Sequence, residues 1–178
     1  MGAALQEQGK LEEAIEAYNK VVSIKPDYAQ TFNNMGATLQ KQGKLDEAID
    51  VYAKATSIKP DYAEAYNNMG RTLHEQSKLD DAIEAYKQAL AIKPDYAEAY
   101  YNMGVSFNEQ GKPEGAIQAY NKALSIKPDY ADAYVNMGNV LTDQEKLEDA
   151  IEAYNRALSN EPDNAEAYYN MGNALKEQ

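Results

Sequence analysis

The chain has 178 residues and a formal net charge of −12, from 29 acidic and 17 basic side chains. An acidic surface repels phosphates, so we expect no nucleic-acid partner and no membrane partner. The absence of cysteine excludes disulfides, thiolate nucleophiles and cysteine-ligated zinc. No segment is apolar and long enough to span a bilayer and the first ten residues are not a secretory leader, so we expect an intracellular, cytoplasmic protein.

A short phrase returns along the chain at a fixed interval of 34 residues. Its copies read "KPDYA" and once "EPDNA", and they begin at Lys25, Lys59, Lys93, Lys127 and Glu161. Met-Gly pairs keep the same interval, at residues 35–36, 69–70, 103–104, 137–138 and 171–172. Self-similarity at such a period indicates stacked supersecondary units rather than a single compact core.

Residues 63–96 show the elements of one unit in chain order. A first helix is predicted from apolar residues at i, i+3, i+4 and i+7, which are Tyr66, Met69, Gly70 and Leu73. After the polar turn "EQSKLD", a second helix is predicted from the stripe Leu79, Ala82, Ile83, Tyr86, Ala89 and Leu90. Pro94 ends that helix, because proline cannot donate into a continuing ladder. Gly70 and Ala82 are small, so we expect the two helices to approach each other closely there.

Acidic residues follow each proline at the spacing of a capping box, as Asp95 and Glu98 do. We therefore expect these carboxylates to cap helices, in preference to forming a cation site or acting as general acids. His74 is the single histidine in a chain without cysteine, so it cannot complete a catalytic triad or a metal site. We expect no catalytic residue, no metal and no cofactor, and hence a protein that is not an enzyme.

The repeating unit resembles the tetratricopeptide repeat family. The resemblance rests on the 34-residue period, an aromatic residue before Met-Gly, Ala-x-x-x-Tyr in the second helix, and the final proline. This chain has Tyr or Phe in place of the family's leading Trp, and Met in place of its Leu. The resemblance implies an all-α fold, a right-handed superhelical solenoid of antiparallel helix-turn-helix repeats. It also implies that the first helices line the inner, concave surface.

The period predicts one continuous array over residues 1–178. Four complete repeats are expected at residues 29–62, 63–96, 97–130 and 131–164. Residues 1–28 form a truncated repeat, and residues 165–178 form only the first helix of a further repeat. We expect a segment of a longer array, because terminal repeats normally carry a polar outer face and Tyr168, Met171 and Leu175 are apolar. Exposed ends of this kind could stack on one another, so end-to-end self-association is an expected interaction.

One polar residue recurs in every predicted first helix, directly before the methionine. We call these residues the asparagine ladder: Asn34, Asn68, Asn102, Asn136 and Asn170. At roughly 100° per residue, Asn68 lies about 150° from the apolar stripe of its helix, beside Asn67 and Arg71. A primary amide offers a donor and an acceptor together, which suits the backbone of an extended peptide. The alternative is that the asparagines were copied by duplication or bond within the scaffold.

The ladder is similar to the asparagine ladder in the tetratricopeptide region of O-GlcNAc transferase and to that of armadillo-type peptide carriers. We predict a protein-interaction scaffold that binds an extended, neutral or basic peptide segment in the concave groove. Local preference is expected from the residues beside the ladder, which are Asn67, Arg71, Tyr101, Val135, Asn139 and Tyr169. Because Arg71 is the one evident basic residue on this face, we expect no clamp for carboxylates. Two alternatives stay open: the substrate-recognition region of a larger enzyme such as a glycosyltransferase, and a self-assembling or idealised array.

Overall fold

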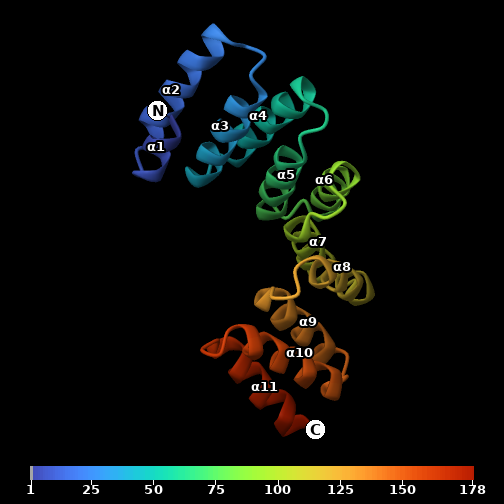
Figure 1. Cartoon of the computed structure of the whole chain (residues 1–178). Coiled ribbons are helices and arrows are strands. Elements are labelled where there is room, and N and C mark those ends of the chain that lie inside the picture. The colour runs from blue at the N-terminus through green and yellow to red at the C-terminus, as the bar shows by residue number, and fades with distance from the viewer. Residues whose placement is uncertain (1) are drawn as a thin grey trace. The chain divides into compact units, whose positions relative to one another are not determined.

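The computed structural model describes residues 2–178, and these residues form eleven α-helices and no strand (Figure 1). The helices are α1 (Gly2–Glu7), α2 (Leu11–Ile24), α3 (Ala29–Lys41), α4 (Leu45–Ile58), α5 (Ala63–Glu75), α6 (Leu79–Ile92), α7 (Ala97–Glu109), α8 (Pro113–Ile126), α9 (Ala131–Asp143), α10 (Leu147–Asn160) and α11 (Ala165–Glu177). The prediction of an all-α helical repeat is confirmed. No helix within the described part of the chain is both long enough and apolar enough to cross a membrane.

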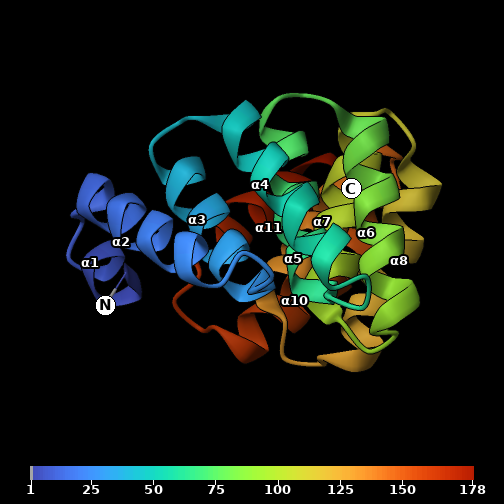
Figure 2. The same ribbon diagram turned by 90° about the horizontal axis from the view of Figure 1, so that it is seen from above.

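The helices belong to two compact units, divided between Pro94 and Asp95. The first unit stacks the hairpins α1/α2, α3/α4 and α5/α6, and the second stacks α7/α8, α9/α10 and the single helix α11. The paired helices of a hairpin lie side by side, as α3 and α4 do in both views (Figure 1 and Figure 2). Within a unit each second helix also packs on the next first helix, and successive first helices contact each other, as α3 does with α5 and α9 with α11.

Each hairpin is held by a tyrosine of the second helix that packs on a glycine of the first. The four tyrosines at the centres of the complete hairpins are at most 1% exposed: Tyr52, Tyr86, Tyr120 and Tyr154. A Cβ atom added to Gly70 would lie 2.6 Å from Cε1 of Tyr86. The predicted close approach at Gly70 is therefore confirmed, because only a residue without a side chain leaves room for the ring.

The predicted capping boxes are wrong. The residue at the N-terminal cap of α7 is Tyr96, one position after Asp95, and no side chain of that cap bonds the helix. The equivalent cap of α5, Tyr62, keeps its ring buried at 6% exposure and donates a hydrogen bond to Gln30 Oε1 at 2.6 Å. In α5 and α7 the aspartate therefore lies one residue before the cap, where its side chain does not bond the first turn. Among α2 to α11, only α11 has a side-chain cap, from Asn164 to the Ala167 N–H at 2.9 Å.

The turn inside each hairpin needs one residue in the left-handed backbone region. Glycine occupies this place in three hairpins, with φ of +74° at Gly9, +73° at Gly43 and +67° at Gly111. Ser77 and Glu145 hold the same place in the other two, with φ of 58° and 59°. A side chain in this region costs about 1–2 kcal/mol, because Cβ crowds the following carbonyl oxygen.

Replacing Ser77 or Glu145 by glycine is therefore expected to raise the free energy of unfolding by about 1 kcal/mol, after the greater backbone entropy of glycine is subtracted. Urea unfolding followed by far-UV circular dichroism measures the change. The reverse substitution, Gly111→Ser, serves as the matched control and should lower stability by a similar amount. A loss of stability in Ser77→Gly and Glu145→Gly would contradict this expectation. It would show that contacts of the two side chains stabilise the fold by more than the backbone strain costs.

Candidate functional site

The asparagine ladder lies on the first helices of both units, and all five side chains are half-buried. Asn34 and Asn68 belong to the first unit, on α3 and α5. Asn102, Asn136 and Asn170 belong to the second unit, on α7, α9 and α11. Asparagine is a poor helix former, so its recurrence here needs contacts that offset its low propensity.

In the first unit, the ladder amides bond to neighbouring polar side chains. Asn68 donates through Nδ2 to Oδ1 of Asn33, on the preceding first helix, at 3.1 Å. Asn34 accepts through Oδ1 from Nε2 of Gln30 at 2.9 Å. The Gln30 carbonyl in turn accepts the Tyr62 hydroxyl at 2.6 Å. Asn68 is thus tied to α3 by its own amide, and Gln30 is held by Tyr62, the residue at the cap of α5.

In the second unit the same arrangement recurs with different acceptors. Asn136 donates through Nδ2 to the hydroxyl oxygen of Tyr101 on α7 at 3.0 Å. Asn170 donates through Nδ2 to Oδ1 of Asn139 on α9 at 2.8 Å. That oxygen also accepts the hydroxyl of Tyr154 at 2.9 Å. The buried hairpin tyrosine therefore orients Asn139, and Asn139 orients the last amide of the ladder.

The inter-helix bonds occupy only part of each amide. Asn68, Asn136 and Asn170 each use one N–H in the bonds above, and their Oδ1 atoms accept no hydrogen bond from the described residues. A primary amide has two N–H donors and an oxygen that accepts. One donor and the oxygen remain for a ligand, while the bonded N–H fixes the orientation of the group. The alternative interpretation was that the asparagines bond within the scaffold. It accounts for one N–H of each of these three amides and not for the rest of the group.

The positions next to the ladder divide into buried and exposed residues. Asn67 is 1% exposed and Val135 is 3% exposed. The residue directly before the ladder asparagine faces a neighbouring first helix, which buries these two side chains. Neither side chain can touch a ligand, so we remove both from the predicted binding residues. Sequence reasoning also missed Asn33, which is 7% exposed and holds Asn68. The sequence could have indicated Asn33, because it precedes Asn67 by 34 residues and so holds the same position in its repeat.

Four of the predicted neighbours remain at the surface to different extents. Arg71 is exposed, Tyr169 is 71% exposed, and Tyr101 and Asn139 are half-buried. The Tyr101 ring packs against the ring of Tyr130, with centroids 4.9 Å apart. Burial raises the pKa of the Tyr101 phenol, and the carboxylate of Asp132 adds to that rise, whereas the Asn136 N–H opposes it. Tyr101 therefore stays neutral and can accept the Asn136 bond at physiological pH.

The acidic residues that begin the second helices have a structural partner. In four places a glutamine at the end of a first helix donates to the carboxylate 30 residues earlier, as Gln76 does to Asp46 at 2.9 Å and Gln144 to Glu114 at 3.0 Å. These bonds link successive hairpins within a unit. No cluster of three or more potential metal ligands occurs among the residues that the structure describes.

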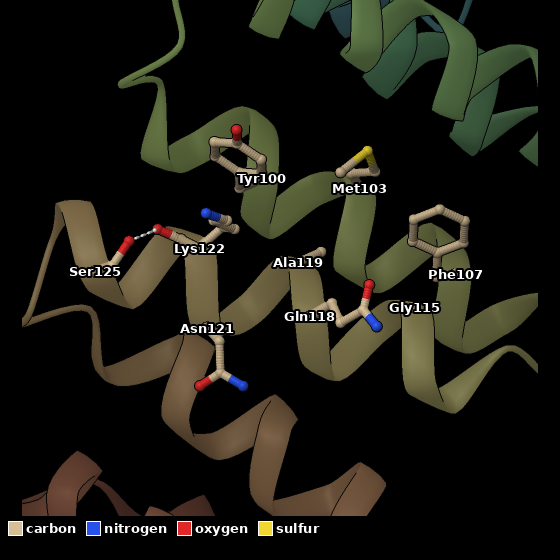
Figure 3. Close-up of a pocket in the computed structure, with 9 residues that line it drawn as sticks. All are labelled: Tyr100, Met103, Phe107, Gly115, Gln118, Ala119, Asn121, Lys122 and Ser125. Atoms are coloured by element: carbon tan, nitrogen blue, oxygen red, sulfur yellow. Dashed lines mark hydrogen bonds between the residues drawn. The ribbon is translucent and has the colours of Figure 1, made fainter.

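A hollow of roughly 650 Å³ opens on the hairpin α7/α8 (Figure 3). Tyr100, Met103 and Phe107 of α7 form one wall, and α8 forms the other with Gly115, Gln118, Ala119, Asn121, Lys122 and Ser125. A Cβ atom on Gly115 would lie 3.2 Å from the Phe107 ring. The other repeats have leucine and an acidic residue at these two places, so Phe107 and Gly115 are a size-matched pair. The exposed lining of the hollow is mostly apolar.

A protein-family model described as TPR repeat matches the chain in overlapping segments, at residues 2–43, 41–77, 70–111, 104–142 and 138–178. Together these matches extend over all residues from 2 to 178. A comparison with curated protein sequences finds no match.

Several solved structures are similar to this chain. A crystal structure of MamA shares 30% sequence identity at a TM-score of 0.84, over 93% of this chain and 96% of that one. YrrB, a TPR protein with an unusual peptide-binding site, shares 21% identity at a TM-score of 0.77, over 94% of this chain and 87% of that one. PilF of Pseudomonas aeruginosa shares 21% identity at a TM-score of 0.88, over 98% of this chain and 80% of that one. The latter two likenesses show a common fold.

Proposed function

The chain belongs to the tetratricopeptide repeat family, whose repeats serve as protein-interaction scaffolds, and on that premise we propose that its asparagine ladder binds an extended peptide segment. The observation that carries this proposal is the state of the ladder amides. Asn68, Asn136 and Asn170 are each oriented by one bond to a neighbouring helix and retain an oxygen and an N–H for a ligand.

The chemistry of this surface suits main-chain recognition. An extended peptide presents N–H and C=O groups in alternation, and a primary amide can accept from the first and donate to the second. Because the bond to Asn33, Tyr101 or Asn139 already fixes the amide, less rotamer freedom is lost when the ligand binds. Contacts to backbone groups tolerate many ligand sequences, and the exposed Tyr169 and Arg71 add local preference.

The charge of the protein selects among ligands. With a net charge of −12, the scaffold attracts neutral or basic segments and repels acidic ones. Surface attraction of this kind is screened at ionic strengths near 0.15 M, where the Debye length is about 8 Å. Binding to a basic segment should accordingly weaken as salt is added, while main-chain contacts to a neutral segment should change little.

A peptide array probed at two salt concentrations identifies ligands for the test. Alanine at Asn68, Asn102 and Asn136 together is expected to preserve helicity and to weaken binding of a selected peptide at least tenfold, about 1.4 kcal/mol. The matched control is Asn155→Ala, which removes an exposed asparagine from the second helix α10. Equal affinity in the triple variant, the control and the parent protein would remove the ladder from the function.

A further inference from the structure

The side-chain amide of Asn139 lies between two donors of the second unit. Its Oδ1 accepts the hydroxyl of Tyr154 at 2.9 Å and an N–H of Asn170 at 2.8 Å. Asn170 cannot bond to the residue before the preceding ladder asparagine, because that residue is Val135. A hairpin tyrosine and the ladder asparagine of the next first helix thus form a place for one amide oxygen, which we call the two-donor site.

The same two donors occur in two further places where no amide lies between them. The 34-residue period gives the residues that correspond to Tyr154, Asn170 and Asn139, which are Tyr52, Asn68 and Ala37 in the first unit and Tyr120, Asn136 and Val105 in the second unit. Ala37 and Val105 are half-buried and carry no hydrogen-bonding atom in their side chains. Neither can supply the oxygen that Asn139 supplies.

The three tyrosine rings are placed alike on their first helices. A Cβ atom added to the glycine of the same hairpin would lie 2.5 Å from Cε1 of Tyr154 and 2.6 Å from Cε1 of both Tyr52 and Tyr120. All three side chains are at most 1% exposed. We therefore expect each hydroxyl to reach the same position beside its first helix, where only Tyr154 meets an amide.

The hydroxyl of Tyr52 has no hydrogen-bond partner among the described residues, although it is fully buried. Thr72 lies near it, but the Thr72 hydroxyl donates to the main-chain oxygen of Asn68 at 2.9 Å and is not in bonding geometry with Tyr52. Tyr120 also donates no hydrogen bond within the described part of the chain. Burial raises the pKa of both phenols, so both keep the proton that a ligand oxygen would accept.

The side chains whose charges reach the Tyr52 hydroxyl are exposed. After burial, the largest influences on the pKa of Tyr52 are Arg71, which lowers it, and Glu75, which raises it. Glu75 accepts a hydrogen bond from Gln40 at 2.5 Å at the surface. Exposed side chains change rotamer within nanoseconds, so they can uncover the hydroxyl while the helices stay in place.

We propose that an amide oxygen of the peptide ligand occupies the two-donor site beside Ala37 and the one beside Val105, as Asn139 does within the chain. The inference rests on the proposed function and names the positions along the ladder that hold the ligand. Each site directs two donors at one oxygen, the tyrosine O–H and the N–H that the ladder asparagine does not use internally. Asn139 fills the third site, so that site is closed to a ligand oxygen.

Closing the two open sites tests the proposal. The double variant Ala37→Asn with Val105→Asn copies the arrangement of Asn139, and we expect it to weaken binding of a peptide selected on the array at least about tenfold. The matched control is Ala53→Asn, which adds an asparagine at an exposed position of α4 and should bind as the parent chain does. Circular dichroism and urea unfolding check that the variants are folded. Unchanged affinity in a folded double variant would overturn the proposal.

Two tyrosine variants make the test independent of the added side chains. Tyr52→Phe removes a hydroxyl without a partner, so we expect no loss of stability and binding weakened about fivefold. Tyr154→Phe removes a hydroxyl bonded to Asn139, so we expect a lower urea midpoint and a smaller loss of affinity than in Tyr52→Phe. Equal losses of affinity in the two variants would contradict the proposal.

A variant of the peptide identifies the source of the oxygen. We expect the selected peptide to keep its affinity when its asparagine and glutamine residues are replaced by alanine, because every residue of an extended segment still presents a main-chain carbonyl. A loss of affinity would show that side-chain amides of the ligand supply the oxygen.

This inference and the proposed function fail in different ways. Equal affinity of the parent chain and the variant with alanine at Asn68, Asn102 and Asn136 would remove peptide binding by the ladder, and the two-donor sites with it. If that triple variant weakens binding while Ala37→Asn with Val105→Asn does not, the ladder stands and only the two-donor sites are excluded.

Discussion

Replacing Gly138 by alanine is expected to destabilise the second unit by about 2 kcal/mol. The added methyl group would lie 2.5 Å from Cε1 and 2.8 Å from Cζ of Tyr154. The ring has no space to move into, because Tyr154 is 1% exposed and its hydroxyl is bonded to Asn139. Overpacking of this kind outweighs the roughly 1 kcal/mol that alanine gains over glycine inside a helix.

The repeat supplies a matched control for this prediction in Gly172, which belongs to the same Met-Gly pair on α11 but has nothing within 4 Å of its Cβ position. Gly172→Ala should therefore raise stability by up to about 1 kcal/mol when measured at low concentration. Urea unfolding of both variants gives the comparison. A double variant, Gly138→Ala with Tyr154→Leu, should show coupling between the two sites, because the shorter side chain relieves the contact. Equal effects at Gly138 and Gly172 would contradict the structural role of the pair.

The protein is expected to lose stability steeply above pH 10. Burial raises the pKa of Tyr52, Tyr120 and Tyr154 above the ordinary phenol value of 10.0. In the unfolded chain these phenols ionise near pH 10, whereas the folded chain keeps them neutral. The unfolded state therefore binds fewer protons, and stability falls as pH rises. The stabilisation is fully present below pH 10 and decreases by about 1.4 kcal/mol per pH unit for each such tyrosine.

Urea midpoints between pH 8 and pH 11.5 measure this loss, and phenolate absorbance near 295 nm reports ionisation in the same samples. We expect most of the phenolate signal from the buried tyrosines to appear together with the loss of helicity. The variant Tyr154→Phe keeps the ring and removes one phenol, so its midpoint should fall less steeply with pH. Ionisation of all fifteen tyrosines while the helices remain intact would contradict the burial argument.

The tyrosine–glycine pairs and the asparagine ladder illustrate two kinds of repetition. A pair such as Tyr86 and Gly70 recurs because each hairpin must solve the same packing problem. The ladder amides recur on the opposite side of the first helices, where packing does not require asparagine. Their acceptors change from Asn33 to Tyr101 to Asn139, yet the donor is retained. Retaining the amide while its internal partner changes favours a role for the amide toward a ligand.

Local sequence determined the hairpin itself. The 34-residue period, the apolar stripe from Tyr66 to Leu73 and the stop at Pro94 place each helix within a few residues of its observed bounds. The close approach at Gly70 also follows from sequence, because the smallest side chain marks where two helices come nearest. These features depend on residues within one repeat, and neighbouring repeats only reproduce them.

Tertiary structure decided what depends on the next repeat. Tyr96 rather than Asp95 occupies the cap of α7, as Tyr62 does in α5, where its hydroxyl bonds Gln30 on the preceding first helix. The bond from Asn68 to Asn33 joins residues 35 apart, and no pattern within one helix indicates it. The acceptor of the ladder amide likewise differs between repeats, since Asn136 bonds to Tyr101 and Asn170 bonds to Asn139. Such differences come from how hairpins stack, which identical letters in two repeats cannot specify.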